Sequence, residues 1–375
     1  MVLPWRSRGG VAKRRNQLTT GDISVVETKI PVQLRSSSRK ERIKSPRVQL
    51  SPRDAVEISQ RLENAAARDE YAECYEIVTK IKNLGGDVNR KCLVQNGGVV
   101  ALSSCFERFA AVRERHERLL EEILFVLSSW LPLSRSEGFS KMGSTASLNC
   151  LVWFLNNATT DAKTRQNAAF CIREVIAVDK KYVHALTGIE GACDGLVKII
   201  KDSVSTSSTK ASLMVIYRTI SCNDKIAAIF VKLGLVELIT EMMVNNAEKS
   251  VCERSLVVLN AICDNELCKE DVLTNALIVP LLVKKILRVS DLATQCSVSI
   301  LWKLWKNNNG DRLLVEAFQV GAFEKLLVLL QVGCEEKTKE RASELLRNLN
   351  HCRNEIEKTN CVDSSMHLKN VKKSF

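Results

Sequence analysis

The chain has 375 residues, 45% of them hydrophobic, with a net charge of +12 and only 6 prolines. This hydrophobic content is ample for a continuous core, and few prolines leave long helices free to form. No run approaches the roughly 18 apolar residues that a membrane span needs, and no sustained two-residue alternation is present, which excludes a membrane-spanning protein and argues against a β-sheet.

The N-terminal segment is basic and poor in apolar side chains. Residues 1–53 contain 13 Lys and Arg against 3 Asp and Glu, so only +2 of the net charge belongs to the rest of the chain. Such a segment cannot bury enough surface to offset its ordering entropy, and we predict a disordered basic tail over residues 1–50. Within it, Lys13-Arg14-Arg15 is either a nuclear signal, a contact with an anionic surface, or a short basic run without a function.

The first helices are predicted to begin at Ser51. Ser51-Pro52-Arg53-Asp54 is typical of a helix start with proline in the first turn, and a second helix ends at Gly85-Gly86. Because a solenoid needs a polar outer face at its ends, we predict that residues 51–87 form N-terminal capping helices.

A helix with an apolar stripe then recurs along the chain. Its copies centre on five polar residues separated by 45, 42, 43 and 44 positions, namely Arg173, Arg218, Asn260, Lys303 and Arg347. Each copy is preceded by a partner helix, and most partner helices begin at a glycine. This period is typical of armadillo or HEAT units. We therefore predict an all-α, armadillo-type solenoid of about six repeats over residues 88–350, with a disordered C-terminal tail over residues 351–375.

The same five polar residues, called here the predicted ladder, are candidates for a partner-binding groove. Such a ladder binds an extended peptide through side-chain hydrogen bonds, and its positive charge favours the binding of acidic segments. The alternative is that they are ordinary solvated helix positions. Trp302 and Trp305 share one of these helices and are either core residues or exposed binding anchors. Mostly small residues, expected where helices approach closely, stand five positions before the ladder: Ala168, Leu213, Ser255, Val298 and Ala342.

Motifs for chemistry are not recognisable. His116 lies in the charged run ERHER and is predicted to be on a solvated helix face, and Cys263 with Cys268 lacks the second pair that a zinc site needs. There is no phosphate-binding glycine motif. We predict no catalytic residue, no metal and no cofactor. Nucleic acid is not an expected partner, because the folded part is almost neutral and has no basic patch interleaved with aromatic residues.

The cysteines and the N-terminus bear on the cellular compartment. Many of the 14 cysteines fall on apolar stripes, including Cys105, Cys150, Cys171, Cys252 and Cys296, where a thiol acts as a small hydrophobe. Residues 1–15 have no apolar signal-peptide core. We therefore predict a reducing, intracellular location, cytoplasmic or nuclear.

Several phrases resemble the plant U-box proteins with armadillo repeats. They are PWRSRGG near the start, TKIPVQLR over residues 28–35, SPRVQLSP over residues 45–52, and the helices from Ile58 to Gly85. The order of linker, capping helices and repeats also matches. The resemblance implies an E3 ubiquitin ligase family, in which the U-box docks a ubiquitin-charged E2 enzyme and the repeats choose the protein to be modified, often in stress or defence signalling.

The chain departs from that family where the U-box should stand. The family phrase resembles IPxxFRCPIS; here Ile30-Pro31 and Arg35 match, Leu34 stands in place of Phe, and Ser36-Ser37-Ser38-Arg39 replaces the CPIS segment. The U-box expected near residues 30–45 is therefore predicted to be absent, and no E2-contacting residue can be assigned. A natural relative without a U-box and an incomplete gene product both fit these residues.

Two function hypotheses follow. The first is the substrate-recognition armadillo module of a U-box E3 ligase, which binds protein substrates and lacks ligase activity on its own. The second is a non-catalytic scaffold or adaptor that binds peptide partners. An E3 of this type works by proximity, so it has no covalent catalytic residue even when complete.

Overall fold

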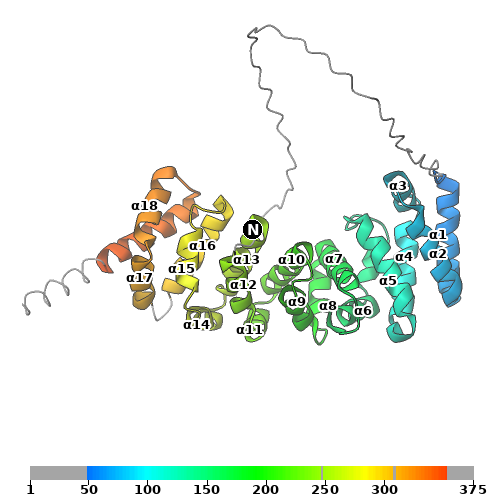
Figure 1. Cartoon of the computed structure of the whole chain (residues 1–375), viewed down its shortest axis with the longest axis horizontal. Coiled ribbons are helices and arrows are strands. Elements are labelled where there is room, and N and C mark those ends of the chain that lie inside the picture. Colours follow the sequence, from blue (N-terminus) through cyan, green and yellow to red (C-terminus); the bar gives the residue numbers. More distant parts are fainter. Residues whose placement is uncertain (1–48, 246–247, 307–309, 353–375) are drawn as a thin grey trace, which may run out of the picture. The chain divides into compact units, whose positions relative to one another are not determined.

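The computed structural model describes residues 49–245, 248–306 and 310–352. Over these residues the chain is helical and contains no β-strand (Figure 1), which confirms the predicted all-α class. None of the helices described is both long enough and apolar enough to cross a membrane. The predicted tails lie outside the described residues, apart from residues 49–50 and residues 351–352. Residues 351–352 are helical and continue the last helix.

Two helices precede the repeats, α1 (Pro52–Ala67) and α2 (Tyr71–Leu84). The predicted start of α1 is confirmed: the Ser51 hydroxyl accepts from the Asp54 N–H at 3.2 Å, and the Asp54 carboxylate accepts from the Ser51 N–H at 3.3 Å. This capping box satisfies two backbone donors at the helix end. Helix α1 packs on α4 (Gly98–Ala110) and α2 packs on α5 (Arg113–Trp130), and both of these helices belong to the first repeat. Their role as a cap over residues 51–87 stays a prediction.

The helices that follow fall into groups of three over the described residues, as an armadillo solenoid requires. The first helices are α3 (Asp87–Gln95), the 3₁₀ helix η1 (Phe139–Gly143), α8 (Lys180–Thr187), α11 (Lys225–Lys232), α14 (Glu266–Thr274) and α17 (Gly310–Gln319). The second helices are α4 (Gly98–Ala110), α6 (Thr145–Asn156), α9 (Ala192–Lys201), α12 (Leu235–Val244), α15 (Ile278–Lys285) and α18 (Ala322–Val332). The third helices are α5 (Arg113–Trp130), α7 (Ala162–Val178), α10 (Thr206–Cys222), α13 (Lys249–Ile262), α16 (Asp291–Trp305) and a helix over residues 336–352.

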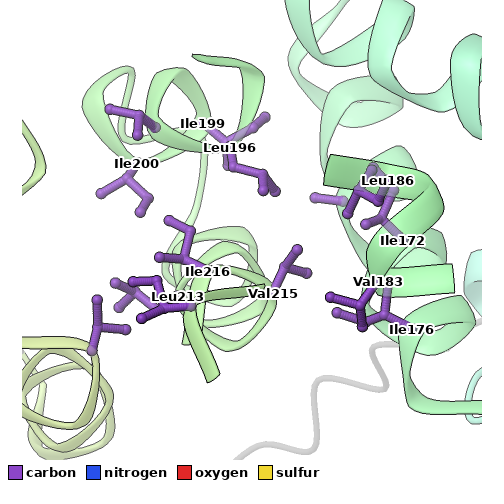
Figure 2. Packing of buried hydrophobic residues seen from close by; sticks show 14 of the residues in the cluster. Ile172, Ile176, Val183, Leu186, Leu196, Ile199, Ile200, Leu213, Val215 and Ile216 are labelled. Carbon is purple, nitrogen blue, oxygen red and sulfur yellow. The ribbon is translucent and has the colours of Figure 1, made fainter. Parts of the chain in front are cut away.

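Neighbouring repeats share one core. Helix α10 packs on α7 and α13, and α13 packs on α16, so the third helices follow one another in chain order (Figure 1). Figure 2 shows how the layers interlock: Val215 of α10 points toward Val183 of α8, while Ile216 points toward Ile200 of α9. The buried apolar residues form a single cluster from Ala55 to Leu349. Each repeat therefore depends on its neighbours for burial.

The five cysteines predicted on apolar stripes (Cys105, Cys150, Cys171, Cys252 and Cys296) are all buried with free thiols. Burial raises the pKa of Cys150, Cys171 and Cys296 to about 12, so these thiols stay protonated near neutral pH. They pack as small apolar side chains rather than as nucleophiles.

Glycines in the left-handed conformation connect the first helix to the second in four repeats. Gly97, Gly191, Gly234 and Gly321 have φ between 76° and 85° and directly precede or begin the second helix. An L-residue with a Cβ adopts this conformation only at a cost, because its Cβ approaches the following carbonyl oxygen.

Replacing Gly234 with alanine is therefore expected to lower the free energy of unfolding by about 1 kcal/mol. The added Cβ meets no atom nearer than 3.8 Å, so the loss comes from the backbone and not from a clash. Gly188→Ala is the matched control, since Gly188 has φ −80° and contacts at 3.6 Å, and it should be neutral or slightly stabilising. Urea unfolding followed by circular dichroism measures both, and equal effects in the two variants would refute the conformational explanation.

Lysines link successive second helices. The Lys198 ammonium on α9 donates to the carbonyl oxygen of Asn156 at 2.9 Å, and Lys285 on α15 donates to that of Met243 at 2.9 Å. Lys325 on α18 donates to the carbonyl oxygen of Val283 at 2.8 Å. In each case the acceptor lies at the C-terminal end of the second helix of the preceding repeat. A lysine there satisfies carbonyls that the helix itself leaves open and complements the helix dipole.

His116 is not on a solvated helix face, and this prediction was wrong. Its backbone leaves the helical conformation (φ −119°, ψ 18°), which kinks α5. The imidazole ring then lies 4.8 Å from the ring of Phe109 and 5.2 Å from that of Tyr71, between centroids. The charged neighbours in ERHER suggested an exposed side chain. The kink turns His116 away from the position that it would have in a regular helix.

The stability of the chain should fall below pH 6.5 partly because of His116. Burial lowers the pKa of His116 below 6.5, the positive charge of Arg115 lowers it further, and Asp69 opposes both. As the pH falls, the unfolded chain takes up this proton before the folded chain does, so the folded state loses stability. We expect the drop in denaturation midpoint between about pH 7.5 and about pH 5.5 to be smaller in His116→Phe than in the wild type. The same pH dependence in both proteins would contradict this assignment.

Candidate protein-interaction surface

The third helices from α7 onward have the same internal register. Their seventh residues are Ala168, Ser212, Ser255, Ser297 and Ala342, and every one of them is fully buried. Small side chains at this position let neighbouring helices approach closely. Leu213 and Val298, the residues predicted at this position, lie one residue later in α10 and in α16. Figure 2 shows Leu213 and Val215 pointing to different sides of α10.

This register divides the predicted ladder between two rows. The twelfth residues of the third helices are Arg173, Tyr217, Asn260, Trp302 and Arg347. The first four are half-buried and Arg347 is exposed. The thirteenth residues, which are more buried, are Glu174, Arg218, Ala261, Lys303 and Asn348. Tyr217, Glu174 and Asn348 also belong to these rows and were not among the predicted residues. The small seventh residue is the signal that could have found them. We call the side of these helices that carries both rows the third-helix face.

Two ladder residues are held by contacts within the protein. The Lys303 ammonium donates to the carbonyl oxygen of Asn260 at 2.7 Å and forms an ion pair with Asp264 at 2.6 Å. The Asn260 side-chain oxygen accepts from the Ser299 hydroxyl at 2.7 Å, and that hydroxyl accepts from Arg341 at 2.6 Å. This network joins α13, α16 and the helix over residues 336–352. Lys303 and Asn260 thus connect repeats, and any role in binding a partner stays a prediction.

The two tryptophans are both half-buried. Trp302 donates its indole N–H to Glu344 at 2.5 Å, and its ring lies 4.2 Å from the Lys306 ammonium and 4.7 Å from the Arg341 guanidinium. Trp305 packs against the hydrophobic core. Trp302 is therefore engaged by polar and charged neighbours on the third-helix face, which favours a structural contribution over that of an unoccupied anchor.

Arg347 is exposed, and its guanidinium donates to the carbonyl oxygen of Ser343 one turn earlier at 3.4 Å. The structure does not bring it together with Arg173 and Arg218, the other two arginines of the predicted ladder. Its role in partner binding stays a prediction.

Arg173 on α7 and Arg218 on α10 both interact electrostatically with Glu174. The Glu174 carboxylate is buried and accepts from the backbone N–H groups of Leu133 and Ser134, both at 3.3 Å, and from the Arg173 guanidinium at 3.3 Å. Burial lowers the pKa of Arg218, Glu174 opposes that shift, and the charge of Arg173 adds to it. The three groups therefore interact electrostatically across α7 and α10.

The third-helix face carries polar and aromatic side chains along successive repeats. It presents arginine, asparagine, tyrosine and tryptophan side chains in register, which are groups that hydrogen-bond and stack with peptides. No group of three His, Cys, Asp or Glu side chains that could hold a metal ion occurs among the residues described.

Solved structures place the fold among the armadillo-repeat proteins. A designed armadillo repeat protein in complex with the peptide (KR)4 aligns with a TM-score of 0.51 and 18% identity, over 65% of this chain and 99% of that one. A computationally designed armadillo repeat protein for modular peptide recognition aligns with a TM-score of 0.54 and 19% identity, over 64% of this chain and 98% of the other. The class of the protein is thus an armadillo-repeat α-solenoid.

The family follows from the sequence comparisons. The model of the plant U-box protein ARM repeat region matches residues 55–372. U-box domain-containing protein 21 of Arabidopsis thaliana is 44% identical over 338 residues, which cover 89% of this chain and 76% of that protein. U-box domain-containing protein 20 of the same plant is 41% identical, over 89% of this chain and 75% of that protein. The chain belongs to the plant U-box proteins with armadillo repeats, which confirms the resemblance read from its phrases.

Members of this group include named ubiquitin ligases. E3 ubiquitin-protein ligase PUB22 of Arabidopsis thaliana is 29% identical over 158 residues, or 40% of this chain and 35% of that protein. The family model matches the armadillo region of this chain, and an armadillo fold is suited to protein binding.

Proposed function

We propose that this chain is the substrate-recognition part of a U-box type ubiquitination system, and that its third-helix face binds the protein to be modified. The observation that carries the proposal is the family match over residues 55–372, which spans the repeats whose third helices are in register. The designed armadillo protein bound to (KR)4 supports a peptide as the kind of ligand that this fold accommodates.

In this proposal the chain binds the substrate and does not itself transfer ubiquitin. The family's E2-docking phrase is replaced here by Ser36-Ser37-Ser38-Arg39, in a segment that lies outside the described residues. We expect the 375-residue chain to bind partners without transferring ubiquitin, and therefore to compete with complete relatives for the same substrates. Localisation in the cytoplasm or nucleus is part of the same proposal.

A reconstituted reaction tests the absence of transfer. The chain is incubated with E1, E2, ATP and ubiquitin, next to a fusion that carries the U-box of U-box domain-containing protein 21 at its N-terminus. We expect ubiquitin chains with the fusion and none with the chain alone. Transfer by the chain alone would overturn this part of the proposal.

Substrate recognition needs a second experiment. Partners are marked in plant cells by a biotin ligase fused to the chain, purified, and offered one at a time to the U-box fusion. We expect some partners to be ubiquitinated, and we expect substitutions on the third-helix face to abolish their binding. The scaffold hypothesis predicts partners that bind through this face and are not ubiquitinated by the fusion. Partners that bind equally well after those substitutions would overturn the proposed surface.

A further inference from the structure

Helix α18 is the last second helix that the structure describes, and within the described residues no later repeat follows it. In the repeats before it, a second helix packs on a first or second helix of the next repeat: α6 on α9, α9 on α12, α12 on α15 and α15 on α17. The side of a solenoid that faces away from the array at its end meets water and needs polar residues there. A polar side is therefore expected on α18.

That side of α18 is apolar. We call it the α18 end face and define it by Phe323, Leu327 and Leu330, which follow the N-cap Gly321 by two, six and nine residues and so lie along one side of the helix. Leu327 is 44% exposed, whereas the sixth residues after the N-cap in the three preceding second helices are at most 6% exposed, namely Val197, Thr240 and Val283. Leu330 is half-buried, whereas the ninth residues there are 1% exposed, namely Ile200, Met243 and Ile286. The α18 end face thus has the residues of an interior repeat without the cover of a next repeat.

A second feature of the array is also incomplete at α18. Each lysine that reaches back to a preceding second helix stands 42 residues after its acceptor, in the pairs Lys198 with Asn156, Lys285 with Met243 and Lys325 with Val283. These acceptors are the last, second-last and third-last residues of their helices. The third-last and second-last residues of α18 are Leu330 and Gln331. The described residues end before a lysine 42 positions later would occur.

The sequence supplies such lysines. An offset of 42 residues leads from Leu330 to Lys372 and from Gln331 to Lys373. Both lysines lie outside the described residues, in the segment that continues from the last helix. The offset that links earlier repeats therefore predicts that this segment reaches the C-terminal end of α18.

The same segment has the pattern of a second helix. The N-caps of α12, α15 and α18 are 43 and 44 residues apart, and a further step of this size leads to Ser364 or Ser365. Serine is a preferred N-cap residue. Leu368, Val371 and Phe375 then follow at i, i+3 and i+7, which places them on one side of a helix. The family model matches as far as residue 372 and so includes most of this segment.

We propose that residues 364–375 bind the α18 end face of the same chain, as the second helix of an incomplete further repeat. Leu368, Val371 and Phe375 cover the apolar side chains of α18, and Lys372 or Lys373 binds the carbonyl oxygens at its C-terminal end. This arrangement replaces the disordered C-terminal tail that we predicted from the sequence, and it is independent of the proposed function.

The connection that the proposal needs is one that the array already uses. Twelve residues separate the end of α10 at Cys222 from the N-cap Gly234 of the next second helix. The same number separates Cys352, the last residue described, from Ser364. The segment can therefore reach the α18 end face without a longer connection than an interior repeat has.

Photocrosslinking in the full chain tests the occupant. p-Benzoylphenylalanine replaces Phe375 in one protein and Asn370 in the control, because Asn370 lies on the opposite side of the same predicted helix. Isotope-labelled and unlabelled chains are mixed before irradiation, so that mass spectrometry separates crosslinks within one chain from those between two. We expect position 375 to crosslink to α18 within one chain, with a yield about fivefold or more above that of position 370.

The other occupants give different crosslinks. Crosslinks to α18 that form only between two chains would assign the α18 end face to a second copy. The absence of any crosslink to α18 in the purified protein would leave the face to another partner. Equal yields from positions 375 and 370 would show that the segment does not bind as a helix with one apolar side. Each of these three results would overturn the proposal.

Hydrogen exchange in the full chain gives a second readout. In the wild type we expect the amides of residues 366–375 to exchange about tenfold or more slowly than those of an unfolded peptide of the same sequence. Leu327→Asp should abolish this protection and the crosslink from position 375, because the proposed contact would bury its carboxylate against apolar side chains.

Val328→Asp is the matched control. Val328 is also 44% exposed, but the preceding second helices carry polar residues at its position, namely Lys198, Glu241 and Lys284. This substitution should leave both readouts unchanged, and far-ultraviolet circular dichroism checks that both variants are folded. If Leu327→Asp and Val328→Asp have the same effect, or if residues 366–375 of the wild type exchange as an unfolded peptide does, the segment does not bind the α18 end face.

Discussion

Replacing Phe230 with alanine should lower the free energy of unfolding by about 3–5 kcal/mol, the usual cost of removing a large buried aromatic side chain. Phe230 lies on α11 and is fully buried. Helix α11 packs on α9, α10, α12, α13 and α14, so the cavity would weaken the interfaces of one repeat with both of its neighbours. Urea unfolding followed by circular dichroism measures the loss.

The helices that lose stability in Phe230→Ala are as informative as the total loss of unfolding free energy. Because a solenoid is held together by contacts between neighbours, the variant should lose hydrogen-exchange protection in α10, α11 and α13 while α1 and α2 keep theirs. Leu267→Ala on α14 is the control, since Leu267 is 82% exposed, and it should change stability by about 0.5 kcal/mol or less. A uniform loss of protection along the whole chain would show that the repeats unfold as one unit instead.

Replacing Glu174 with alanine is expected to lower the free energy of unfolding by about 3 kcal/mol. The substitution leaves the N–H groups of Leu133 and Ser134 without their acceptor and removes the negative charge that faces Arg173 and Arg218. The value lies at the lower end for a broken buried ion pair because one third of the Arg173 side chain is exposed.

A double-mutant cycle separates the two causes. Adding Arg218→Met to Glu174→Ala should restore part of the lost stability, since it removes the charge left unbalanced, while the loss at Leu133 and Ser134 remains. Glu241→Ala, at an exposed position on α12, should have almost no effect. If Glu174→Ala costs no more than Glu241→Ala, the carboxylate does not organise this part of the face.

The second and third helices of most repeats were predictable because apolar periodicity is a strong signal over many residues, whereas the short first helices were not identified. The capping box at Ser51 and the helix ends at Gly85-Gly86 follow local rules and were also predictable. The register of the third-helix face was not predictable. From α7 onward the third helices begin 42 to 45 residues apart, and polar side chains occupy both the twelfth and the thirteenth positions. The residues of the predicted ladder therefore lie one position later in α10 and in α16 than in the other third helices.

The candidate site depends on contacts that a single sequence does not contain. Lys303 and Arg218 occupy the same position in their helices and are both basic, but Lys303 has Asp264 and a carbonyl oxygen to bind, whereas the Nη1 of Arg218 has no partner among the described residues. That difference comes from what the neighbouring repeat places opposite each side chain. For the same reason His116 was misplaced, since neither the kink in α5 nor the rings of Tyr71 and Phe109 beside its imidazole can be read from its charged neighbours in the sequence.

The lysines that reach back to the preceding second helix give the array a direction. Asn156, Met243 and Val283 each receive an ammonium group supplied by the repeat that comes after them. During synthesis on the ribosome, the carbonyl oxygen at each of these helix ends would therefore lack its lysine partner until the next repeat had been made. Truncating the chain between two such repeats would do more than shorten it, because the new last repeat would lose the lysine that binds the carbonyl oxygen at the end of its second helix.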